Sequence, residues 1–321
     1  MGSNLPDNSL GADRLLQSIQ TPNIAIPRDP EGGLTLKLSQ ARQVKLPLAL
    51  IDVPVFEYLP FRSPSRCLDA ISIKLAVIGD LDRAQTRHAE TVSSKVLIHD
   101  AQALRKEASI ICLKGFDRRD DLEGFRRLEG FPCALLKLAP DYWASLGSKR
   151  RSDLRRQQKA AKNIRRVRHK GLPAEYAAKI LELYHQTRNK ADLKLLKHGP
   201  NYFVRTADVS TYLLYFLDKE LVGFHQLVCL EKTLYSQYVG MDYSIAKDYR
   251  LYFNMLIDCI DYGLEHSFAE VDFGITSYRY KLHLGCELRS TWNYFQLTHP
   301  LLNRFLPLLD AVLSPKPAML Q

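Results

Sequence analysis

Hydrophobic and polar positions along the first half of the chain predict strands and helices in turn. From residue 71 to residue 77 every second side chain is Ile, Leu or Val, as in a half-buried strand. Further strands are predicted at 108–113 and 134–138, and helices at 99–108 and 120–129. This order favours a mixed α/β layer over a helical bundle or a β-sandwich.

The second half of the chain shows a further α/β series. The pattern predicts a helix at 174–189, three strands at 212–217, 221–230 and 234–241, and a long helix at 249–266. The long helix has an apolar side that includes Leu251, Met255 and Tyr262. A strand at 271–273, a short helix at 278–284, a strand at 291–297 and an apolar tail helix at 301–313 complete the prediction.

Length and composition indicate an ordinary globular protein. The 321 residues correspond to about two domains. A chain with 46% hydrophobic and 25% charged residues is neither a disordered nor a collagen-like protein. Residues 1–44 are rich in Pro, Gly, Asn and Ser, which predicts a flexible leader.

The net charge of +10 is concentrated in one segment. Eleven basic residues and a single acid, Asp153, lie between Lys149 and Lys170, so the rest of the chain is neutral. We interpret 149–171 as a basic linker helix between an N-terminal lobe at 45–148 and a C-terminal lobe at 172–321. No aromatic residue interrupts the segment, which weakens a role in stacking on bases.

Several classes of protein are disfavoured by the remaining patterns. No apolar run approaches the roughly 18 residues of a membrane span, and the N-terminal residues lack the apolar core of a signal peptide. The six cysteines are scattered and show no metal-ligand spacing. We therefore expect a cytoplasmic protein without a metal. Cys286 follows Gly285 and is a possible nucleophile, but no His or Asp partner is identifiable near it, which favours a small buried thiol.

A set of short motifs resembles the acetyltransferase fold of the GNAT superfamily, and more narrowly its FemAB-like branch. The motifs, which stand in the family's order, are Val222-Gly223, Tyr238-Val239-Gly240-Met241-Asp242, Asp272-Phe273-Gly274, Tyr280-Lys281 and Gly285, together with the stretch 142–156. The resemblance covers roughly residues 45–300. It implies an α/β (α+β) fold with mixed sheets, in which two GNAT-like lobes, the N-terminal one degenerate, are joined by a basic helix.

The resemblance also implies a site for the phosphates of an acyl donor. In this family a small-residue loop before the long helix holds a pyrophosphate on backbone N–H groups and the positive helix end. The matching residues here are Lys247, Tyr249, Arg250, Leu251 and Tyr252. Arg250 and Tyr252 replace the two small residues of the family loop, which puts ordinary acetyl-CoA binding in doubt. Lys247 and Arg250 are able to neutralise a phosphate through their side chains instead.

Four residues are candidates for the chemistry of acyl transfer. His225 is the simplest base, since imidazole titrates at about pH 6.5, and its alternative role is a core histidine. Asp242 at the end of a strand is suited to bind an ammonium group, to act as a base, or to cap a turn. The resemblance places Tyr278 and Lys281 on the short helix where family members carry a thiol-facing tyrosine and a lysine.

Together these observations predict an N-acyltransferase that moves an acyl group from acyl-CoA to an amine by direct attack in a ternary complex. One alternative donor is aminoacyl-tRNA, and a third possibility is a non-catalytic GNAT-like binding protein. The segment 149–170 is suited to bind the phosphates of tRNA, of CoA or of an anionic lipid headgroup, or it is a solvated linker.

Overall fold

The computed structural model describes residues 48–54, 72–80, 85, 92–117, 120–191 and 198–299. The chain forms two compact units. The first unit comprises the described residues before Ala134 together with those after Glu287, and the second unit comprises Ala134–Glu287. The predicted leader 1–44 and the predicted tail helix 301–313 lie outside the described residues. No helix of the described part is long and apolar enough to span a membrane.

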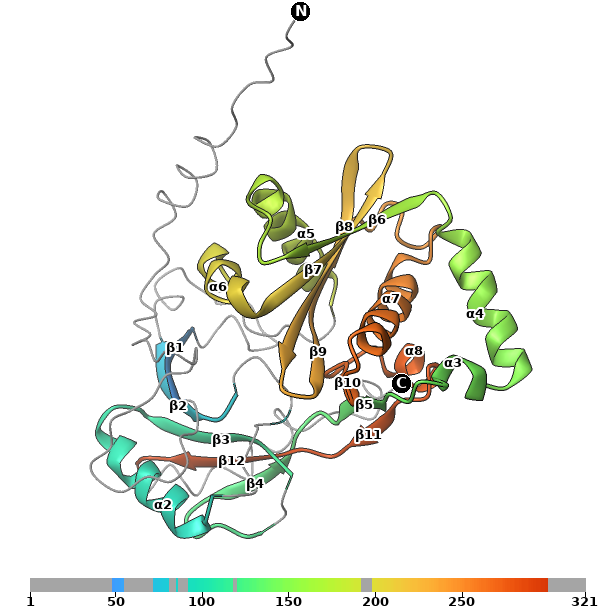
Figure 1. The fold of residues 1–321 in the computed structure, drawn as a ribbon. Helices are drawn as coiled ribbons and strands as arrows, with labels where there is room; N and C mark the ends of the chain where they lie inside the picture. The colour runs from blue at the N-terminus through green and yellow to red at the C-terminus, as the bar shows by residue number, and fades with distance from the viewer. Residues whose placement is uncertain are drawn as a thin grey trace, which may run out of the picture. The chain divides into compact units, whose positions relative to one another are not determined.

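The first unit is built on a five-stranded sheet in the order β1-β2-β3-β12-β4 (Figure 1). Its strands are β1 (Leu48–Pro54), β2 (Ser72–Ile78), β3 (Ile110–Phe116), β4 (Arg126–Glu129) and β12 (Trp292–Leu297). The helix α2 (Ser94–Ala103) begins where the Ser93 hydroxyl accepts a hydrogen bond from Val96 N, and η4 (Leu104–Lys106) follows it. Leu97 and Leu104 pack with Ile111, Leu113 and Phe116 in the core of this unit.

This unit differs from the predicted N-terminal lobe in two places. Residues 126–129 form β4 rather than part of a helix, because they pair with β12, a long-range partner that local periodicity does not reveal. The strand predicted at 291–297 is present as β12, but it lies between β3 and β4 instead of closing the C-terminal lobe. The two compact units divide at residues 133/134 and 287/288. The sequence predicted lobes at 45–148 and 172–321 joined by a linker at 149–171.

The second unit carries a seven-stranded sheet in the order β11-β5-β10-β9-β8-β7-β6. Its strands are β5 (Cys133–Lys137), β6 (Ile164–Lys170), β7 (Ser210–Leu217), β8 (Glu220–Leu230), β9 (Thr233–Met241), β10 (Glu270–Asp272) and β11 (Glu287–Arg289). Strands β6 to β9 form an antiparallel meander, and β10 pairs in parallel with β9. The fold is thus mixed α/β with two sheets, as predicted.

Helices cover both faces of this sheet (Figure 1). They are α3 (Tyr142–Ser145), α4 (Ser148–Ala160), α5 (Ala177–Lys190), α6 (Pro200–Arg205), α7 (Leu251–Glu265) and α8 (Tyr278–His283), with 3₁₀ turns at η5 (Ala174–Tyr176) and η6 (Ala207–Val209). Alternate residues of β7 separate the two cores: Tyr215 packs on the α7 side, whereas Phe216 packs on the α5 side. Gly240 leaves room for α5, since a Cβ there would lie 2.7 Å from the Leu183 carbonyl carbon.

The basic segment is only partly helical, which corrects the predicted helix at 149–171. Helix α4 ends at Ala160, and β6 begins at Ile164 as the edge strand of the sheet. In β6 the buried Ile164 and the half-buried Val167 anchor a strand whose arginines and lysine are mostly exposed. Long cationic side chains are typical of edge strands, because they discourage pairing with another sheet. Charged residues would lie on all sides of a helix through this segment, so the sequence pattern did not indicate the change from helix to strand.

The sheet opens between β9 and β10. The two strands pair only where Glu270–Asp272 meets Thr233–Tyr235, although β9 continues to Met241. Beyond Asp272 the chain stays with β5 instead, since Phe273 N donates to Ala134 O at 2.9 Å and Ala134 N donates to Gly274 O at 3.0 Å. The second half of β9 is therefore left without β10 as a neighbour.

Candidate active site

A cleft of about 650 Å³ lies in the second unit, beside the end of β9. Three elements supply its walls: helix α4, the loop from β9 into the start of α7, and helix α8. The residues that line it are Asp153, Arg156, Gln157, Met241, Tyr243, Ala246, Lys247, Arg250, Tyr252, Phe253, Arg279, Tyr280 and His283. The cleft therefore joins the basic segment to the loop and the short helix that the sequence singled out.

The cleft is strongly positive. Arg156, Lys247, Arg250 and Arg279 line it, and Asp153 is the single lining carboxylate among the described residues. Asp153 Oδ1 pairs with Arg156, whereas its Oδ2 lies 3.0 Å from His283 Nε2. A concave surface with several cations and one acid concentrates anions, and arginine is well matched to phosphate oxygens. The walls are thus suited to bind a phosphate-bearing molecule.

The loop before α7 is a series of tight turns. Asp242 begins it as a turn cap, with Oδ1 accepting hydrogen bonds from Ser244 N at 2.9 Å and Ser244 Oγ at 2.7 Å. These two bonds lower the pKa of Asp242 below its ordinary value. Arg250 ends the loop in the left-handed region, with φ of 49°. The first N–H groups of α7 follow, and a helix start of this kind carries positive partial charge.

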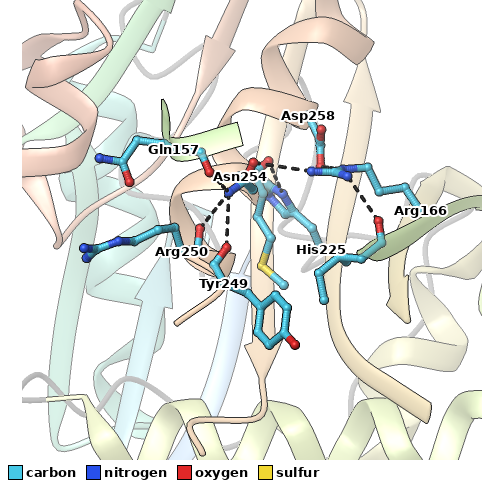
Figure 2. Close-up of polar contacts among 9 residues, drawn as sticks. Gln157, Arg166, His225, Tyr249, Arg250, Asn254 and Asp258 are labelled. Carbon is cyan, nitrogen blue, oxygen red and sulfur yellow. Dashed lines mark hydrogen bonds and ion pairs between the residues drawn. The ribbon is translucent and has the colours of Figure 1, made fainter. Parts of the chain in front are cut away.

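A buried asparagine closes this loop against α4 (Figure 2). Asn254 Nδ2 donates to the carbonyl oxygens of Gln157 at 3.1 Å, Arg250 at 3.1 Å and Tyr249 at 3.4 Å. Asn254 Oδ1 accepts from Arg166 Nη2 at 3.3 Å, and Arg166 Nε in turn donates to Asp258 at 2.8 Å. The sequence analysis did not identify Asn254, because a lone asparagine in an apolar helix carries no recognisable motif.

Three of the five predicted donor-binding residues come together in the cleft. Lys247, Arg250 and Tyr252 line it, whereas Leu251 is buried in the core and Tyr249 packs against that core. Burial raises the pKa of Tyr252 to about 12. Its hydroxyl is therefore protonated at neutral pH.

The structure places His225 in the core rather than in the cleft lining. The side chain is 0% exposed, with Nδ1 3.2 Å from Met255 O and Nε2 2.7 Å from Ser236 Oγ. Because a carbonyl only accepts, Nδ1 carries the proton and Nε2 accepts from the serine. Burial lowers the pKa of His225 to about 4, so the ring is neutral at pH 7. These are the contacts of a core histidine.

Lys281 and Tyr278 also lie in the interior. Lys281 is 2% exposed, and its Nζ donates to the carbonyl oxygens of Phe273 at 2.6 Å, Ile275 at 2.8 Å and Gly274 at 3.3 Å. Tyr278 is fully buried. Helix α8 instead presents Arg279, Tyr280 and His283 to the cleft. The predicted short helix thus reaches the cleft, but Lys281 and Tyr278 lie on its buried face.

The remaining cleft residues were missed individually, although a signal for some of them was present. Asp153, Arg156 and Gln157 share one face of a helix at i, i+3 and i+4 spacing. That spacing is obscured by the eleven basic residues of the segment. Tyr280 belongs to one of the motifs that resemble the family, whereas Arg279 and His283 give no comparable signal, since their exposure depends on where α8 begins.

Cys286 is a buried thiol, the structural alternative that the sequence favoured. It is 5% exposed, and burial raises its pKa to about 12. A thiol of this kind is protonated at neutral pH and is a poor nucleophile. In the part of the chain that the structure describes, no group of three His, Cys, Asp or Glu residues is placed to hold a metal ion.

Comparisons with known proteins agree with this geometry. Residues 148–282 match the family model described as Acetyltransferase (GNAT) domain. This stretch runs from the start of α4 through the meander and α7 into α8, and so contains every residue that lines the cleft except His283. Residues 148–282 are thus similar to the GNAT superfamily, the resemblance that the sequence motifs predicted. A comparison with curated proteins finds no match.

Three solved structures share the fold at low sequence identity. FemX is 14% identical with a TM-score of 0.52, over 81% of this chain and 86% of that chain. L-PGS from Bacillus licheniformis is 11% identical with a TM-score of 0.52, over 76% and 86%. A C-terminal domain described as that of a lysylphosphatidylglycerol synthetase from Agrobacterium fabrum is 12% identical with a TM-score of 0.51, over 74% and 81%. The chain therefore shares its fold with FemX and with L-PGS.

Proposed function

We propose that the protein is an N-acyltransferase that moves an acyl group from acyl-CoA to an amine by direct attack in a ternary complex. The observation that carries the proposal is the cationic cleft at the start of α7, beside the opened strand β9. Within the GNAT fold this cleft offers contacts for the phosphates of a donor beside the strand β9. An acyl-thioester donor with a phosphorylated arm matches these contacts.

The donor would bind along the walls of the cleft. Arg156, Lys247, Arg250 and Arg279 would hold its phosphates, aided by the positive end of α7. Side-chain cations would thus replace the glycine-rich backbone contacts that Arg250 and Tyr252 preclude.

The reaction requires a base, an acid and an approach for the amine. The amine nitrogen would attack the thioester carbonyl, the C–N bond would form, and the C–S bond would break to release a thiolate. His283 lines the cleft and is paired with Asp153, so it is the base we assign to take the amine proton. The protonated Tyr252 hydroxyl is the acid we assign to the leaving thiolate.

The test is release of free thiol from a series of acyl-CoA donors incubated with a panel of amines. The proposal predicts thiol release that depends on the amine, with the acylated amine found by mass spectrometry. Absence of thiol release with every donor would contradict it. Thermal stabilisation by CoA without turnover would instead support a non-catalytic binding protein.

Aminoacyl-tRNA remains a second candidate donor because of charges outside the cleft. Arg155, Lys159 and Lys162 are exposed, and none of them lines the cleft. Two solved structures that share the fold are named for L-PGS and for lysylphosphatidylglycerol synthetase. A tRNA affinity that falls steeply with salt, and that is lost when these three cations are neutralised, would favour this donor. An affinity for anionic lipid vesicles in place of tRNA would assign the surface to a lipid headgroup.

A further inference from the structure

Two arginines line the cleft from different walls, and their separation depends on contacts between those walls. Arg156 lies on α4, and Arg250 lies at the end of the loop before α7. Arg156 pairs with Asp153 of its own helix, and this pair does not connect α4 to Arg250. The distance between the two backbones is therefore fixed by other contacts.

Asn254 provides a contact between the two walls (Figure 2). One amide nitrogen donates to Gln157 O, the residue next to Arg156, and to the carbonyl of Arg250 itself, both at 3.1 Å. The Asn254 side chain is 0% exposed, so water does not compete for these bonds. A single buried amide thus connects the backbones that carry both arginines.

The orientation of this amide is also determined. Arg166 has only donors, so the Asn254 atom that meets its Nη2 must be the acceptor Oδ1. Arg166 is itself fixed by Asp258 at 2.8 Å and by the carbonyl of Ile164 at 3.2 Å. Nδ2 therefore points at the carbonyls of the loop and of α4, which is the arrangement that Figure 2 shows.

The Asn254 side chain also stabilises an unfavourable backbone conformation of Arg250. Arg250 has φ of 49°, in the left-handed region that residues other than Gly, Asn and Asp rarely occupy. Its carbonyl accepts from both the backbone N and the side-chain Nδ2 of Asn254, each at 3.1 Å. These two bonds stabilise the turn at the start of α7. In this turn the Arg250 side chain lines the cleft.

We propose that Asn254 is a positioning residue of the donor site, and that it sets the separation at which Arg156 and Arg250 bind one phosphate group. The proposal rests on the function proposed above, in which the cleft binds the donor. Asn254 itself does not touch the substrate. It acts through the carbonyls of Gln157 and Arg250.

The kinetic test compares Asn254→Ala and Asn254→Asp with wild type, at a temperature where all three are folded. Both variants lose the Nδ2 donor, and the Asp variant keeps the shape of the side chain. We expect the KM for acetyl-CoA to rise about tenfold while kcat stays within about twofold. Ile260→Ala is the matched control: it alters a buried residue of α7 that does not line the cleft, and it should leave this KM unchanged. A fall in kcat at constant KM, or an equal KM change in the control, would overturn the proposal.

A binding measurement tests the role of Asn254 independently of the proposed acyl transfer. Inorganic pyrophosphate is titrated into each protein by calorimetry, which needs no turnover. Wild type should bind it about tenfold more tightly than either Asn254 variant. Weaker binding by the variants together with no thiol release by wild type would overturn the acyl-CoA reaction and uphold the role of Asn254. Equal affinity in all proteins, or no binding by wild type, would overturn the role of Asn254.

Discussion

The Nζ of Lys281 donates a 2.6 Å hydrogen bond to the carbonyl oxygen of Phe273. The same ammonium group also donates to the carbonyls of Gly274 and Ile275, so one buried charge satisfies three successive carbonyls. Directly after them Thr276 and Ser277 have positive φ of 67° and 50°. Lys281 thereby holds the strained turn that leads into α8, the helix that carries Arg279, Tyr280 and His283 to the cleft.

Lys281→Met should therefore destabilise the protein. It would leave three carbonyls without their donor, and we expect the free energy of unfolding to fall by about 3 kcal/mol. Urea denaturation followed by circular dichroism measures this change. If the variant kept its stability but lost acyl transfer, Lys281 would have a catalytic role instead.

His225 should make stability depend on pH. Its pKa is about 4 when folded and 6.5 when exposed, because burial disfavours the charged ring. The unfolded chain therefore binds the proton first, so this contribution is complete above pH 6.5 and is lost as the pH falls toward 4. At pH 5 the loss should be about 2 kcal/mol.

The measurement is the change in unfolding free energy between pH 7 and pH 5, in wild type and in His225→Asn. The comparison uses only this pH dependence, since the substitution also removes hydrogen bonds. A smaller change in the variant is the expected result. The same change in both proteins would show that His225 is protonated equally in the folded and unfolded states.

Tyr252→Phe tests the assigned acid. Removal of the hydroxyl should lower kcat about 100-fold, while the KM for the donor changes little, because the ring remains in place. Tyr249→Phe is the control, since Tyr249 is half-buried and does not line the cleft. Similar kcat values for the two variants would remove Tyr252 from the mechanism.

Cys286→Ala should retain activity. The thiol is buried and protonated, and it lies outside the cleft lining. We expect kcat to stay within about twofold of wild type. A covalent acyl adduct on Cys286, detected by mass spectrometry after incubation with donor alone, would contradict direct attack by the amine.

The sequence predicted the elements of the second unit well, because their signals are local. The strands at 212–217, 221–230 and 234–241 and the helix at 249–266 correspond to β7, β8, β9 and α7 with small changes at their ends. It did not predict β4 or the placement of β12, because each depends on pairing between residues more than 150 positions apart. The change from α4 to β6 within the basic segment was missed for a similar reason, since β6 forms by pairing with β7.

The candidate site was predicted by region more accurately than by residue. The loop 247–252 and the helix at 278–284 both reach the cleft, yet His225, Lys281 and Tyr278 are buried beside it. A residue type suited to catalysis does not reveal which face of its element is exposed. For Lys281, the three accepting carbonyls come from a turn whose shape the sequence does not specify.

The most direct test compares three single substitutions on the two walls of the cleft. Arg156 and Arg250 line it, whereas Arg155 is next to Arg156 in sequence but is exposed outside the lining. Each arginine is replaced by Gln, and the KM for acetyl-CoA is measured by thiol release at two salt concentrations. We predict that Arg156→Gln and Arg250→Gln raise KM at least about tenfold, whereas Arg155→Gln changes it by no more than about twofold. Equal effects at Arg155 and Arg156, or no thiol release by the wild-type protein, would contradict a phosphate-binding donor cleft at this position.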